Sequence, residues 1–125
     1  MWNLNRKYEG AYVGTEIDEV WWKRYKKDKM FARGNGKFWF DETGIYFHRY
    51  LTRHPIHIPF ELMRSFKIGH WHSGRWTMHV PILKIVWYKD NRKLSSGFAV
   101  TKHREDLIKL IHLFQQRTSA VFENA

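Results

Sequence analysis

The sequence predicts a mainly β fold (α+β): about seven antiparallel strands form a barrel closed by one C-terminal helix, with a short helix near the N-terminus. From residue 29 onward, apolar and polar residues alternate in short segments separated by Gly, Asn and Asp, which is the pattern of β-hairpins. Near the C-terminus the spacing changes to that of an amphipathic helix. The chain has 125 residues, of which 43% are hydrophobic. A chain of this length and composition is expected to form one core.

The first segment differs from the rest in its spacing. Thr15 is followed three residues later by Asp18, an acidic variant of the capping box that begins many helices. Apolar residues then recur at roughly helical intervals, namely Ile17, Val20, Trp21 and Tyr25. We therefore expect a short helix over about residues 16–27, with Trp21 anchoring its apolar side on the barrel.

Seven segments have the character of strands: residues 29–33, 36–41, 44–50, 55–60, 63–70, 81–89 and 93–101. Hairpin pairing tests them, because it fixes which residues lie opposite one another. A tight turn at residues 42–43 sets Phe38 opposite Phe47, and a connection at residues 51–54 sets Phe47 opposite Ile58. These three strands then share one apolar face.

The last hairpin and the helix complete the expected core. A two-residue turn at Asp90 and Asn91 sets Leu83 opposite Phe98. After Thr101, a candidate N-cap, apolar residues recur at i, i+3, i+4 and i+7 in a helix that we expect to end near Arg117. The predicted core consists of Phe38, Phe47, Ile58, Leu83, Phe98, Leu110 and Phe114. The expected organisation is an N-terminal segment over residues 1–28, a domain over residues 29–117 and a tail over residues 118–125.

Three stretches resemble pleckstrin-homology-like (PH-like) domains, in particular their GRAM and bacterial PH-related branches. GKFWFDETGIYFHRY is similar to their opening hairpin, IHIPFELMRSFKI to the step between two later strands, and ILKIVWYKDNRKLSSGFAVTKHREDLIKLI to the final hairpin and closing helix. The resemblance implies a split barrel that acts as a binding module for phosphoinositides, other lipids, peptides, proteins or its own copies. Phosphoinositide-binding members have a long basic loop between their first two strands. Here the candidate loops, residues 34–36 and 41–44, are short, so we expect no deep head-group pocket.

The charge of the chain is compatible with an anionic partner and equally with a soluble basic protein that has no polyanion partner. Lys and Arg number 22 against 12 Asp and Glu, a formal net charge of +10, which favours association with phosphates of a membrane or a nucleic acid. The candidate residues for an anionic surface are Lys23, Arg24, Lys26, Lys27, Arg33 and Lys37. In the alternative interpretation, Lys23, Lys26 and Lys27 are only the solvated face of a helix that docks on the barrel.

Aromatic residues mark a second candidate surface, for a protein partner, a second copy of the chain or single-stranded nucleic acid. Its members are Trp39, Tyr46, His48 and His57 on the outward faces of the first hairpins, where His48 is expected opposite His57, and Arg75 and Trp76 in a loop. Packing within the protein is the alternative for the sheet face, because a bare apolar patch reduces solubility.

The sequence favours neither an enzyme nor a metal protein. It contains no cysteine and no HExxH motif, and a zinc site needs three or four convergent ligands. Its acidic residues fall at turns and in the expected helices rather than in strand interiors. We expect no catalytic residue, no metal and no cofactor. No apolar run reaches the roughly 20 residues that span a bilayer, so we expect a cytoplasmic protein that can associate with a membrane surface.

Overall fold

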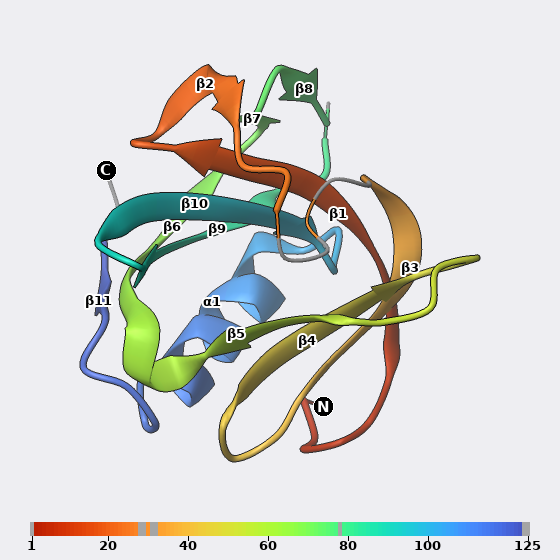
Figure 1. Ribbon diagram of the computed structural model, residues 1–125. Coiled ribbons are helices and arrows are strands. Elements are labelled where there is room, and N and C mark those ends of the chain that lie inside the picture. Colours follow the sequence, from red (N-terminus) through yellow and green to blue (C-terminus); the bar gives the residue numbers. More distant parts are fainter. Residues whose placement is uncertain (1, 28–29, 31–32, 78, 124–125) are drawn as a thin grey trace.

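The computed structural model describes residues 2–27, 30, 33–77 and 79–123 (Figure 1). Its strands are β1 (Tyr8–Ile17), β2 (Val20–Arg24), β3 (Gly34–Phe40), β4 (Gly44–Arg49), β5 (Ile56–Pro59), β6 (Met63–Gly69), β7 (Trp71–His72), β8 (Arg75–Trp76), β9 (Ile82–Lys89), β10 (Arg92–Ala99) and β11 (Val121–Phe122). A 3-10 turn, η1 (Phe60–Leu62), precedes β6, and the helix α1 (Arg104–Phe114) follows β10. The fold is mainly β, with one α-helix near the C-terminus of the described chain, as predicted.

One sheet carries the fold, in the order β11-β6-β9-β10-β1-β3-β4-β5. Its pairs are antiparallel except β11 with β6, which is parallel. β1 is shared between two halves of the sheet, because its N-terminal part pairs with β3 and its C-terminal part with β10. A bulge at Tyr12/Gly14 lies where the partners change, and bulges increase the local bend and twist of a sheet. The resulting split barrel wraps around α1 (Figure 1).

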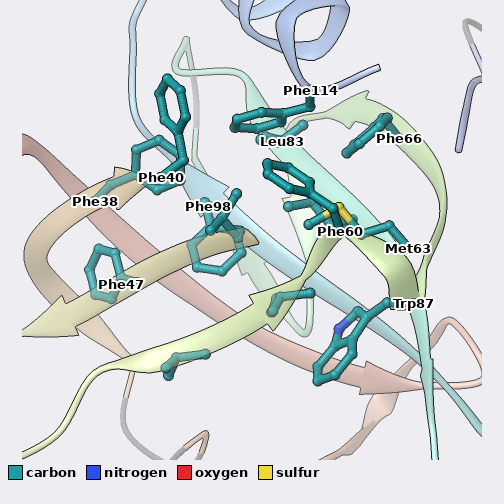
Figure 2. Packing of buried hydrophobic residues seen from close by; sticks show 14 of the residues in the cluster. Phe38, Phe40, Phe47, Phe60, Met63, Phe66, Leu83, Trp87, Phe98 and Phe114 are labelled. Atoms are coloured by element: carbon teal, nitrogen blue, oxygen red, sulfur yellow. The ribbon is translucent and has the colours of Figure 1, made fainter. Parts of the chain in front are cut away.

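The predicted core is confirmed. Each of its seven residues is at most 1% exposed. The Phe114 ring of α1 lies 5.3 Å from that of Phe40 in β3 and 6.0 Å from that of Phe66 in β6, so the helix packs against strands from both halves of the sheet. Figure 2 shows these aromatic side chains gathered in the interior. Burial of so many large rings is the main source of stability in a chain without disulfides.

The predicted hairpin registers are confirmed in two of three cases. Phe38 lies opposite Phe47, and Leu83 lies opposite Phe98. The third register is wrong by two residues, because Ile58 pairs with Ile45 instead of Phe47. The chain turns earlier than expected at Leu51, whose φ is 68°. Since the shift is even, every side chain keeps its face and the core is unchanged.

The expected N-terminal helix is wrong. Residues 16–24 form part of a β-hairpin, β1 and β2, whose turn residues Asp18 and Glu19 both have positive φ, 54° and 57°. Positive φ at both central positions is typical of the tight turns that join strands. The pairing of β1 with β10 overrides the local helical spacing, and Trp21 is 50% exposed instead of anchoring a helix.

Two expectations about the C-terminal helix also change. The α-helix begins at Arg104 with His103 as its N-cap, and the Thr101 hydroxyl only accepts a hydrogen bond from the His103 amide. The helix ends at Phe114 rather than near Arg117. Residues 118–125 include β11, which extends the sheet beside β6. The expected strand over residues 29–33 lies mostly outside the described residues.

Candidate functional site

The connection between β1 and β3 is long and basic, which corrects the expectation of short loops. In the sheet β1 and β3 are neighbours, and residues 18–33 join them. This connection contains Lys23, Arg24, Lys26 and Lys27. The loop was missed because the sequence pattern assigned these residues to a helix that preceded the barrel.

Three tryptophans project from this connection and from β7, and we call them the tryptophan tip: Trp21, Trp22 and Trp71. Their exposed fractions are 50%, 65% and 43%. The Trp21 ring centroid lies 5.4 Å from that of Trp22 and 6.0 Å from that of Trp71, both in edge-to-face arrangements. Figure 1 shows β2, β7 and β8 side by side at one extremity of the molecule. Sequence reasoning did not bring these residues together, because they are neighbours only in the folded chain.

A buried polar cluster holds the two segments of the tip together. The Ser73 amide donates to the Glu16 carboxylate at 2.7 Å, and Arg33 donates to the Ser73 carbonyl at 2.9 Å. His72 is fully buried, and its Nε2 lies 3.0 Å from the Gly14 carbonyl oxygen. These contacts attach the loop after β7 directly to β1.

His72 is held as the neutral imidazole. Burial lowers its pKa, and Lys84 lowers it further, whereas the nearby Glu16 carboxylate and hydrogen bonds act in the opposite direction without reversing the shift. The imidazole packs on the backbone of β10 at Gly97, where a Cβ atom would lie 2.5 Å from His72 Cδ2. Only glycine leaves room for the ring at that position.

A second buried network fixes β1 to β10 and to the segment after β2. The Tyr12 hydroxyl lies 2.5 Å from Thr15 Oγ1 and donates to the Met30 carbonyl at 3.2 Å. Thr15 Oγ1 in turn lies 2.7 Å from Ser96 Oγ, which accepts a hydrogen bond from Trp87 Nε1 at 3.0 Å. Burial raises the pKa of Tyr12 to about 12, so its hydroxyl stays protonated. The network thus holds the backbone at Met30, on the C-terminal side of the basic stretch.

Ion pairs fix the turn between β1 and β2. Glu19 accepts from Lys67 at 2.5 Å and from Lys93 at 2.8 Å. Burial would raise the pKa of Glu19, but the hydrogen bonds from these two lysines outweigh it and lower the pKa. The turn that leads into β2, and so to Trp21 and Trp22, is therefore held to β6 and β10 by ion pairs.

The basic residues of the connection divide into two groups. Lys23, Lys26 and Lys27 are exposed, and no described carboxylate forms an ion pair with them. Arg24 is half-buried and has partners within the fold. The exposed lysines are thus available to a ligand.

Lys27 also lines a cleft of about 270 Å³ that the sequence did not reveal. The other lining residues are Tyr25, Lys89, Asp90 and Arg92. Asp90 and Asn91 form the tight turn between β9 and β10 with positive φ, 52° and 63°, as the sequence predicted. Two cationic residues beside that turn therefore meet Lys27 from the connection between β1 and β3. A cleft with this lining suits an anion such as a phosphate.

Arg33 and Lys37, the remaining predicted basic residues, are engaged within the fold. Arg33 holds the Ser73 carbonyl, as described above. Lys37 pairs with Glu9 at 2.5 Å, which raises the pKa of Lys37, and the Tyr50 hydroxyl donates to the same carboxylate. Arg33 therefore supports the tryptophan tip from within the fold, whereas Lys37 is paired with β1.

The aromatic face of β3, β4 and β5 is a stack of rings. Trp39 and Tyr46 are opposite each other as predicted, with ring centroids 5.2 Å apart and nearly parallel planes. His57 pairs with Tyr46, not with His48 as expected, and its ring stacks on Tyr46 at 4.2 Å. The Lys7 ammonium group lies over the Trp39 ring, with Nζ 4.9 Å from the ring centroid. Ring faces that already contact one another are closed to bases, so this geometry disfavours base stacking.

The remaining candidates add no further site. His48 Nε2 lies 2.8 Å from the Thr52 carbonyl oxygen, and the side chains of Arg75 and Trp76 lie outside the described residues. The described residues contain no group of three or more His, Cys, Asp or Glu side chains placed to hold a metal ion. Within the same residues, no helix has the length and apolar character required to cross a bilayer.

Comparison with known proteins gives one finding. A family model described as Bacterial PH domain-like matches residues 3–112. The match includes β1 and β2 as well as the barrel strands and most of α1. Neither the curated proteins nor the solved structures gave a match.

Proposed function

Because this chain belongs to the Bacterial PH domain-like family, whose fold serves in general as a binding module, we propose that it binds anionic phospholipid surfaces through the connection between β1 and β3. The observation that carries the proposal is the exposure of Lys23, Lys26 and Lys27 in one connection, where Lys27 also lines a cleft together with Lys89 and Arg92. An anionic membrane attracts such a cluster with about 1 kcal/mol per basic residue near the surface.

Two features support a membrane surface over the other partners considered. Lysine is depleted in the centres of protein–protein interfaces, whereas it is favoured beside anionic head groups. The sheet face that the sequence offered for nucleic acid does not favour base stacking, because the rings of Trp39, Tyr46 and His57 already stack on one another. PH-like domains are generally non-catalytic, and our proposal involves no reaction.

The test is sedimentation of the protein with vesicles of phosphatidylcholine alone and with phosphatidylglycerol added. We expect binding only to the anionic vesicles, weakening as salt screens the charges. The variant Lys23→Gln/Lys26→Gln/Lys27→Gln should lose about 3 kcal/mol of binding free energy, on the order of 100-fold in partition coefficient.

A matched control removes the same charge elsewhere. Arg53, Lys102 and Lys109 are exposed and lie outside the connection between β1 and β3, and their replacement by Gln should weaken binding far less. Equal losses for both triple variants would mean that net charge alone attracts the protein. Absence of anionic-vesicle binding by the unmodified protein would refute the proposal, and binding to an oligonucleotide with a steep salt dependence would replace it.

A further inference from the structure

The tryptophan tip is the most exposed aromatic group of the described chain, and its indoles differ from the other described ones. Trp87 is buried and hydrogen-bonded, Trp2 donates to the Asp106 carbonyl, and Trp39 stacks on Tyr46. In contrast, no described residue accepts a hydrogen bond from the indole N–H groups of the tip. Three half-exposed indoles with unpaired donors therefore gather at one end of the molecule.

An indole in this state suits the boundary between head groups and acyl chains. Its ring is apolar and its N–H is a donor, so it is best accommodated where one side is apolar and the other is wet. Edge-to-face packing of Trp21 with Trp22 and Trp71 leaves ring surface exposed on each. The tip thus has the chemistry of an aromatic membrane anchor.

The area of the tip argues against a protein partner for it alone. A fully exposed indole side chain has at most roughly 250 Å² to bury, so the exposed fractions of the three residues correspond to roughly 400 Å² on the tip. A specific protein interface needs about 800 Å² per partner. Lys23, Lys26 and Lys27 beside the tip suit the anionic head groups of a bilayer instead.

The tip is also pre-formed, so that insertion would not have to order it. Hydrogen bonds from Ser73 to Glu16 and from Arg33 to Ser73 join its two segments. Glu19 fixes the turn below it through Lys67 and Lys93. A rigid projection binds more tightly than a flexible loop, because less conformational entropy is lost.

We propose that Trp21, Trp22 and Trp71 enter the boundary between head groups and acyl chains of an anionic membrane while Lys23, Lys26 and Lys27 remain among the head groups. This inference rests on the proposed function and specifies how the same surface meets its partner. It goes beyond charge attraction, because it requires contact with the acyl region.

The experiment uses the full chain and phosphatidylcholine–phosphatidylglycerol vesicles whose acyl chains carry bromine, which quenches tryptophan fluorescence at short range. We expect quenching of the unmodified protein. A Trp21→Phe/Trp22→Phe/Trp71→Phe variant should still sediment with vesicles but lose most of the quenching, whereas a Trp39→Phe control should keep it. Circular dichroism and thermal unfolding check that both variants remain folded.

A second variant measures the energetic contribution of the tip without relying on fluorescence. Trp22→Ala/Trp71→Ala should reduce partition into anionic vesicles by at least about 10-fold, with the salt dependence of binding unchanged. Vesicle binding without quenching would overturn this inference and leave the proposed function standing. Quenching that survives in the triple Phe variant would overturn it as well, and failure of the unmodified protein to bind vesicles would overturn both proposals.

Discussion

Gly97→Ala should destabilise the protein although it adds only one methyl group. The new Cβ would lie 2.5 Å from His72 Cδ2 and 2.9 Å from His72 Cγ. His72 is fully buried and cannot swing into solvent, so the ring must move away and give up its hydrogen bond to the Gly14 carbonyl. Overpacking of this kind costs about 1–3 kcal/mol and the hydrogen bond about 1 kcal/mol, a total of about 2–4 kcal/mol.

Urea and thermal unfolding measure this loss. For a chain of this length a loss of that size corresponds to a decrease in melting temperature of roughly 10 °C. Gly69→Ala is the matched control: it is also a strand glycine without positive φ, and its new Cβ meets only the flexible end of Lys84 at 3.1 Å. That variant should change stability by less than about 1 kcal/mol.

A double variant assigns the effect to the ring. In a His72→Ala background the space occupied by the imidazole is free, so Gly97→Ala should then cost less than about 1 kcal/mol. The reasoning is refuted if Gly97→Ala unfolds within about 0.5 kcal/mol of the unmodified protein, or if its cost persists when His72 is absent.

Three further predictions follow from burial, backbone conformation and charge. Phe47→Ala removes a ring that is 1% exposed and should cost about 3–5 kcal/mol in chemical denaturation; a loss below about 1 kcal/mol would contradict its central position. Leu51→Gly should stabilise the protein by about 1 kcal/mol, because Leu51 is fully exposed and has a φ of 68°, a conformation that favours glycine; a loss of stability would show that the side chain makes a contact we have not identified. Because the folded-state pKa of His72 lies below its ordinary value of 6.5, the unfolded chain binds more protons, and stability should fall as pH decreases below about 6.5. The pH dependence of urea unfolding should be weaker for His72→Gln than for the unmodified protein, and an unchanged slope would argue against a neutral buried imidazole.

The strands and their core were predictable because they depend on parity. A side chain in a hairpin points inward or outward according to its position relative to the turn, so Phe38 and Phe47 could be placed from residues 42–43 alone. The error at Ile58 left the core intact for the same reason, since the register slipped by an even number of residues.

The hairpin of β1 and β2 could not be predicted in the same way. Ile17, Val20 and Trp21 have helical spacing, and that spacing is also compatible with a tight turn between two strands. Pairing of β1 with β10, a strand far along the chain, selects the hairpin over the helix. Local patterns do not contain that information.

The candidate site was found in part. Lys23, Lys26 and Lys27 lie close together in the sequence, so the basic group could be identified from the sequence alone. Its arrangement in three dimensions could not. The contributions of Trp71 and of Lys89 depend on contacts between distant segments of the chain, Trp71 with Trp21 and Lys89 around one cleft with Lys27, and these contacts exist only in the folded protein.

The position of β1 in the middle of the sheet has a consequence for how the chain folds. Thr15 of β1 and Ser96 of β10 meet although 81 residues separate them in sequence. A ribosome that synthesises the chain from its N-terminus must therefore release β10 before β1 can acquire its partner on that side. Contacts at such separation make folding slow, since a long loop must close before they form. Until then the edge of β1 and the aromatic residues of β2 are open to other chains, so the nascent protein is most prone to aggregation during the interval before β10 arrives.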